Sequence, residues 1–197
     1  MTWVNGAFVL LSVFLVGVPL DSPVPRPAQI ILIRHADKPA DPTDPNLSPA
    51  GVQRAERLVS FITTNPAMNR FGLPVAVFAT RTTTQGTGVR TQETVAPLAR
   101  ALKLPVQTPY LGAEYAALAK LILADPAYAG KTIIICWNHS EIPHLAAALG
   151  VTEDLAKWKG SVFDQVYAIG YRAGQAVLTI SHYDSPSARP TERPPTQ

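Results

Sequence analysis

The chain has 197 residues, of which 47% are hydrophobic and 16% are charged, and this balance is typical of a folded protein rather than a disordered one. The net charge is only +3, and the sequence contains no run of five or six basic residues. Both features argue against nucleic acid as a partner. The single cysteine, Cys136, excludes an internal disulfide framework. A chain of this length favours one domain with a substantial core.

The two ends of the chain differ in composition from its centre. Residues 7–18, AFVLLSVFLVGV, form an apolar run of about 12 residues, shorter than the roughly 20 that a membrane-spanning helix needs. Residues 1–20 therefore predict a secretory signal peptide or, counting the run from Trp3, an uncleaved membrane anchor, and hence an exported protein, periplasmic or extracellular. The proline-rich residues 21–28 predict a linker, and residues 185–197 predict a disordered tail.

Residues 29–184 alternate short apolar runs with helical patterns and are predicted to form the folded domain. Three runs are continuous and rich in β-branched residues, which favours strands buried on both faces over half-exposed strands. These runs are QIILIRH at 29–35, VAVFAT at 75–80 and KTIIICWN at 131–138.

Helices are expected between these strands. Ser48 and Pro49 are typical of an N-cap and a first helical position, and apolar residues follow at helical spacing. The pattern predicts a three-layer α/β/α sandwich with a mostly parallel central sheet, closed by a hairpin around RAGQ at 172–175. The spaced residues of the first helix are Val52, Leu58, Val59 and Ile62, and later helices are predicted over 91–103, 114–123 and 142–149.

Two histidines follow two of the predicted strands directly. Arg34 and His35 end the first run, and Asn138 and His139 end the run that starts at Lys131. In parallel sheets, ligands bind beyond the carboxyl ends of the strands. We therefore expect both histidines to lie at one crevice.

With these motifs, the chain resembles the histidine phosphatase superfamily, which is related to the phosphoglycerate mutases, over nearly all of residues 29–184. The first strand ends in LIRHADKP, with Ala36 where the family usually has glycine. The further motifs are LSPAGVQRAERL at 47–58, an arginine four residues before a threonine (Arg90 and Thr94), and IIICWNHSEIPHLAAALG at 133–150.

The resemblance implies a metal-independent hydrolase of small-molecule phosphomonoesters that uses no cofactor. His35 would attack phosphorus, because a neutral imidazole with one nitrogen held by a hydrogen bond is a competent nucleophile. Arg34 and Arg90 would bind the phosphate oxygens, since guanidinium groups pair with them bidentately. His139, protonated beside the phosphate, would stabilise the charge of the transition state.

The general acid that protonates the leaving group has two candidates in the sequence. Glu114 precedes a predicted helix, as in the mutase-like branch of the family, and Glu141 lies two residues beyond His139. Glu114 is preferred, although each glutamate also suits a helix N-terminus. Arg81 is an alternative to Arg90 as the second phosphate-binding arginine. Asp37 and Lys38, which follow His35 closely in the sequence, suit either the wall of the crevice or a surface loop.

Other chemistries fit less well. His139, Glu141 and His144 do not suggest a metal site, because residues five apart lie about 140° apart on a helix and Pro143 interrupts this one. The sequence contains no nucleophile elbow, phosphate-binding P-loop or complete dinucleotide fingerprint. The alternative to an enzyme is a non-catalytic protein of the same fold that binds a phosphorylated ligand or acts as an interaction domain.

Overall fold

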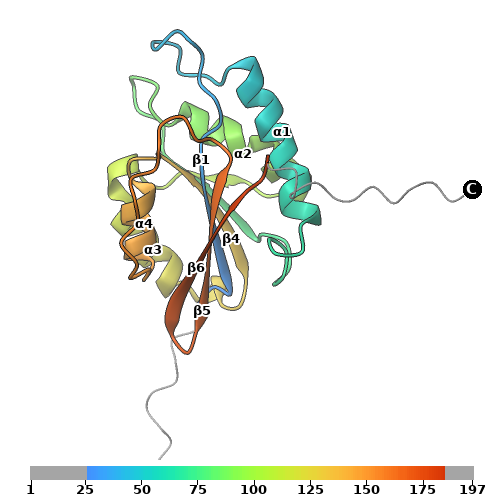
Figure 1. Ribbon diagram of the computed structural model, residues 1–197, viewed down its shortest axis with the longest axis vertical. Helices are drawn as coiled ribbons and strands as arrows, with labels where there is room; N and C mark the ends of the chain where they lie inside the picture. The colour runs from blue at the N-terminus through green and yellow to red at the C-terminus, as the bar shows by residue number, and fades with distance from the viewer. Residues whose placement is uncertain (1–25, 185–197) are drawn as a thin grey trace, which may run out of the picture.

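A computed structural model describes residues 26–184, which form one six-stranded sheet with helices on both faces (Figure 1). The first four strands are parallel to one another, β5 is antiparallel to β1, and β6 is antiparallel to β5. The order across the sheet is β3-β2-β4-β1-β5-β6. The strands are β1 (Gln29–Arg34), β2 (Ala76–Ala79), β3 (Val106–Gln107), β4 (Thr132–Trp137), β5 (Gln165–Arg172) and β6 (Gln175–His182).

Within the described residues, four α-helices cover the sheet, and they divide between its two faces. The helices α1 and α2 pack on one face, and α3 and α4 pack on the other (Figure 1). The predicted three-layer α/β/α sandwich with a mostly parallel sheet is therefore confirmed. The helices are α1 (Pro49–Thr64), α2 (Val89–Leu102), α3 (Tyr115–Ala124) and α4 (Ile142–Ala148), with 3-10 turns at Gly112–Glu114 and Pro126–Tyr128.

The central strand β1 explains why the apolar runs are continuous. Ile31 and Ile33 pack with the side chains of α1 and α2, whereas Ile30 and Leu32 pack with those of α3 and α4. All four are fully buried. A strand covered on both faces has no solvent-facing side, so polar residues do not alternate with apolar ones.

The first helix begins as predicted and buries Leu58 and Ile62 of the predicted face, but not Val52. The Ser48 Oγ accepts a hydrogen bond from the Gly51 amide at 3.1 Å and caps α1. Val52, expected in the core, is 52% exposed. The helix also turns Gly51, Ala55 and Phe61 inward, and Gly51 lies against the backbone of Asp37.

The predicted signal peptide or anchor, most of the linker and the tail lie outside residues 26–184. Within that range, no helix is both long and apolar enough to cross a membrane. The short edge strand β3 was not predicted, since two residues show no periodicity. The predicted hairpin does form, and its turn residues Ala173 and Gly174 both have positive φ angles, as a type I′ turn requires.

Candidate active site

A cavity of about 170 Å³ opens beyond the carboxyl ends of β1 and β4, where the sequence predicted a crevice. Most of its wall is polar and uncharged, and His35 and Arg90 are its basic members. The lining residues are His35, Pro42, Thr43, Pro45, Gln85, Gly86, Thr87, Gly88, Arg90, Thr91 and Asn138.

His35 is held in one orientation by its own turn of backbone. Its Nδ1 lies 2.8 Å from the carbonyl oxygen of Ala36, and the residue is only 9% exposed. A proton on Nδ1 satisfies this contact, so the lone pair of the neutral ring lies on Nε2. Burial, with the nearby charges of Arg34 and Arg90, lowers the pKa of His35 to about 4 although the bond to Ala36 opposes it. The imidazole is therefore neutral at pH 7 and can act as a nucleophile.

The backbone that follows His35 is tied to α2. The amide of Ala36 donates to the Thr94 Oγ1 at 2.8 Å, and this hydroxyl donates to the carbonyl oxygen of Arg90 at 2.7 Å. The spacing of Arg90 and Thr94 thus has a physical reason, because one helical turn brings the threonine hydroxyl to the arginine carbonyl. Thr94 connects the His35 loop to the helix that carries Arg90.

Arg90 lines the cavity and also holds the loop that faces it. Its Nε donates to the carbonyl oxygen of Asn46 at 3.0 Å, and its Nη2 donates to that of Asp44. Among residues 26–184, Nη1 has no hydrogen-bond partner. Arg90 is therefore placed to bind an anion with part of its guanidinium while the rest fixes the loop.

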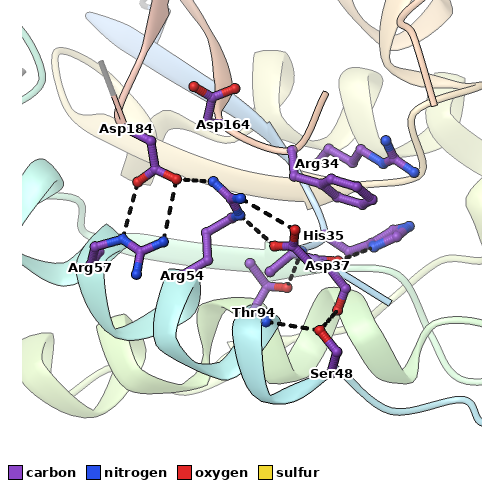
Figure 2. A network of polar contacts seen from close by, with 12 residues as sticks. Arg34, His35, Asp37, Ser48, Arg54, Arg57, Thr94, Asp164 and Asp184 are labelled. Carbon is purple, nitrogen blue, oxygen red and sulfur yellow. Dashed lines mark hydrogen bonds and ion pairs between the residues drawn. The ribbon is translucent and has the colours of Figure 1, made fainter. Parts of the chain in front are cut away.

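Arg34 does not line this cavity. Its Nη1 donates to the carbonyl oxygens of Gly160 at 2.7 Å and Val162 at 3.1 Å, and its guanidinium lies 4.0 Å from the ring centre of Phe163. In Figure 2 the side chain extends away from the ion pairs around Asp37. Burial lowers the pKa of Arg34 to about 10, which leaves it charged at pH 7. In this structure Arg34 holds the loop before β5.

His139 follows β4 as predicted and lies beside the same loop. A Cβ placed on Gly160 would be 3.9 Å from its Nε2. Burial lowers the pKa of His139, and the charges of Arg34, Lys38 and Lys157 lower it further. His139 does not line the cavity, contrary to the expectation that both histidines would do so, but its charge contributes to the lowered pKa of His35.

Neither candidate general acid lines the cavity. The exposed Glu114 Oε2 accepts hydrogen bonds from the Leu111 amide at 2.7 Å and from Arg81 at 3.1 Å. Arg81, the alternative to Arg90, is thus engaged with Glu114. Glu141 is the N-cap residue of α4, and its carboxylate has no hydrogen bond within the described part of the chain.

Asp37 belongs to an ion-pair network rather than to the cavity wall. Arg54 of α1 lies between Asp37 and Asp184, and Arg57 also binds Asp184 (Figure 2). Burial raises the pKa of Asp37, but the hydrogen bond and charge of Arg54 outweigh it and hold the pKa below its usual value. The network ties the His35 loop to α1 and to the end of β6. Lys38 is exposed.

The residues considered for a metal site do not form a ligand cluster in the described part of the chain. His144 stacks on Tyr115 with ring centres 5.7 Å apart. Across residues 26–184, no three or more His, Cys, Asp and Glu side chains lie close enough together to hold a metal ion.

No binding residue was predicted in most of the cavity wall, which includes the loop that Arg90 holds. The sequence of this loop, DPTDPN at 41–46, repeats an Asp-Pro pair, which is typical of turns. The side chain of Asp41 accepts a hydrogen bond from the amide of Thr43, and that of Asp44 accepts one from the amide of Asn46. Two such Asx turns make a compact loop. The place of Asn138 in the cavity wall could have been predicted more simply, because Asn138 directly precedes His139 at the end of a strand.

The depressed pKa of His35 predicts a pH-dependent stability. The unfolded chain protonates this histidine below its ordinary pKa of 6.5, whereas the folded chain keeps it neutral until about pH 4. Unfolding therefore becomes easier as the pH falls through this window, by about 3 kcal/mol from this residue. In urea denaturation, His35→Asn should lose less stability between pH 6.5 and 4 than wild type. The exposed His144→Asn is the control; a wild-type pH slope in both variants would contradict the prediction.

Comparison with known proteins supports the fold. No protein-family model matches the sequence, and no curated protein matches it. Among solved structures, a proposed alpha-ribazole-5'-P phosphatase from Escherichia coli aligns with a TM-score of 0.55 at 15% identity, covering 80% of this chain and 97% of its own.

Two further structures agree with this result. A proposed phosphohistidine phosphatase SixA from Agrobacterium tumefaciens gives a TM-score of 0.51 at 17% identity, over 78% of this chain and 95% of its own. A mycobacterial glucosyl-3-phosphoglycerate phosphatase, solved with inorganic phosphate, gives 0.51 at 12% identity, over 83% of this chain and 100% of its own. The chain has the fold of these phosphatases, which confirms the histidine-phosphatase-like fold expected from the sequence.

Proposed function

We propose that the protein is a metal-independent phosphomonoester hydrolase of the histidine phosphatase superfamily that acts through a phosphohistidine at His35. The observation that carries the proposal is the state of His35. Its Nδ1 contacts the Ala36 carbonyl oxygen at 2.8 Å, its pKa is lowered to about 4, and it shares a cavity with Arg90. A neutral, oriented imidazole beside a guanidinium is suited to attack a phosphate ester.

The proposed reaction has two steps. In the first, Nε2 of His35 forms a bond to phosphorus while the bond from phosphorus to the leaving oxygen breaks, and a general acid protonates that oxygen. In the second, water attacks phosphorus and gives a proton to the base form of the general acid, the bond to Nε2 breaks, and phosphate leaves with His35 neutral again. The contact with Ala36 keeps the Nδ1 proton in place throughout.

Positive charge around His35 supports this chemistry. Arg34, Arg90 and His139 all lower its pKa by their charges, so a dianionic ester at the same place would be attracted by them. A bound dianion would also raise the pKa of His139 and favour the protonated donor that the resemblance implies. In this account Arg90 contacts the phosphate from the cavity wall, and Arg34 contributes chiefly through its charge.

The size and polarity of the cavity suit a small, polar phosphomonoester. Its volume of 170 Å³ lies below the roughly 300 to 1,000 Å³ of pockets for drug-sized ligands.

The N-terminal apolar segment leads to a further proposal, that the protein is exported and meets its substrate outside the cytoplasm. If that segment is retained, it would hold the protein at the membrane.

Glu114 is proposed as the general acid, with Glu141 as the alternative. The residue that acts should matter most for esters of alkyl alcohols, because a poor leaving group needs its proton more than p-nitrophenolate does. We expect Glu114→Gln to reduce kcat for an alkyl phosphate by about 100-fold and for p-nitrophenyl phosphate much less. If Glu141→Gln instead lowers kcat for the alkyl phosphate selectively and Glu114→Gln keeps the wild-type kcat, Glu141 is the general acid.

A phosphate-binding protein without turnover is the second candidate. Hydrogen bonds of Arg34 and Arg90 to backbone carbonyls, with both glutamates outside the cavity, favour it. Hydrolysis of p-nitrophenyl phosphate by the wild-type protein in EDTA separates the two functions. The enzyme should turn over at a rate that the chelator does not change. Binding of inorganic phosphate by calorimetry without any turnover would support the second candidate and overturn the first.

A further inference from the structure

Asn138 has an uncommitted polar side chain in the wall of the cavity. It follows β4 directly and lines the cavity together with His35 and Arg90. Its backbone carbonyl accepts hydrogen bonds from the amides of Glu141 and Ile142. Its side-chain amide, half-buried, makes no hydrogen bond to any residue in the range 26–184. An amide in this position has two N–H donors to offer a ligand.

Gly112 makes the room for this amide. A Cβ at residue 112 would lie 2.3 Å from the Asn138 Nδ2, a separation that van der Waals contact forbids. The φ angle of Gly112 is outside the left-handed region, so its backbone conformation does not itself require glycine. The carbonyl oxygen of Gly112 accepts from the Nε1 of the fully buried Trp137 at 2.8 Å, which fixes the glycine in place.

Two hydroxyl groups in the wall are already engaged. The Thr43 Oγ1 donates to Asp41 at 2.7 Å, and the Thr91 Oγ1 lies 2.7 Å from the carbonyl oxygen of Gly88. Their hydroxyl protons are used within the protein. The amide protons of Asn138 are not, so its contact with a ligand would cost no existing hydrogen bond.

Resting on the proposed function, we propose that Asn138 is a substrate-binding residue that donates a hydrogen bond to a phosphoryl oxygen, and that Gly112 positions it. A fixed neutral donor stabilises charge on the phosphoryl oxygens in the transition state without adding a buried charge to the free protein. The substitution Asn138→Asp would replace the donor by an anion, which would repel a dianionic ester.

The test is a double-mutant cycle on p-nitrophenyl phosphate hydrolysis. Asn138→Ala removes the donor, and Gly112→Ala displaces it, since the clash falls on the movable end of a side chain. We expect each to lower kcat/KM by about 10- to 100-fold. The double variant should be no worse than Asn138→Ala alone, because only one interaction is lost. Gly170→Ala, whose Cβ has ordinary contacts, is the matched control and should keep wild-type kcat/KM.

Two outcomes would overturn the inference while the enzyme remains active. Wild-type kcat/KM in Asn138→Ala would remove its substrate-binding role, and additive losses in the double variant would show that Gly112 does not act through Asn138. If wild type has no turnover, the proposed function fails, and calorimetry with inorganic phosphate then decides on Asn138 separately. Weaker phosphate binding by Asn138→Ala would support the inference, and equal binding would overturn it.

Discussion

Replacing His35 by asparagine is expected to lower kcat for p-nitrophenyl phosphate by at least about 10⁴-fold, the scale of loss when a catalytic nucleophile is removed. The shorter side chain keeps an N–H that can bond to the Ala36 carbonyl, but its nitrogen lone pair is delocalised into the amide, so it has no basic nitrogen with which to attack phosphorus. Steady-state kinetics in EDTA measure the loss.

The control for this prediction is His144→Asn, an exposed histidine on α4 that stacks on Tyr115. It should retain the wild-type kcat, and both variants should unfold cooperatively. A His35→Asn protein that keeps a tenth or more of the wild-type kcat would exclude His35 as the nucleophile.

The second large effect is expected at Gly51, in α1. A Cβ on this residue would lie 2.3 Å from the carbonyl oxygen of Asp37, 3.2 Å from its carbonyl carbon and 3.1 Å from its amide nitrogen. All three atoms belong to the backbone, so no side chain can rotate away to make room. We expect Gly51→Ala to lower the free energy of unfolding by about 2 to 3 kcal/mol, although alanine is the better helix former.

Urea denaturation of Gly51→Ala beside Val52→Ala measures this effect. Val52 is the next residue of the same helix and is largely exposed, so its replacement should change stability by less than about 0.5 kcal/mol. The Gly51 variant should also lose the proposed phosphatase activity, because the loop that it displaces follows His35. An unchanged or higher stability for Gly51→Ala would contradict the close contact of α1 with this loop.

The fold was predictable because the sequence signals were local and agreed with one another. Continuous β-branched runs predicted β1 and β4, and Ser48 followed by Pro49 predicted the start of α1. The composition of a strand buried on both faces and the N-cap of a helix are both set by residues adjacent in the sequence, so a single sequence is enough to predict them. Val52 was the exception, since it is exposed whereas Gly51 beside it makes the tertiary contact.

The position of His35 at a cavity beyond the strand ends was also predictable, because the carboxyl ends of parallel strands meet at one edge of the sheet, and the resemblance to the family pointed to Arg90. His139, expected at the same crevice, does not line this cavity. The partners of the charged side chains were not predictable. Arg34 turns to carbonyl oxygens of a loop about 125 residues away in the chain, and Glu114 pairs with Arg81. Such long-range contacts of long side chains leave no periodicity in a sequence.

The central claim is that His35 carries phosphate during turnover. The most direct measurement is a rapid quench of the wild-type protein with labelled phosphomonoester, followed by mapping of the label to a peptide. The account predicts a phosphohistidine at His35 that is labile in acid and stable in base, and that is absent from His35→Asn. Rapid turnover without any label on His35 would contradict it.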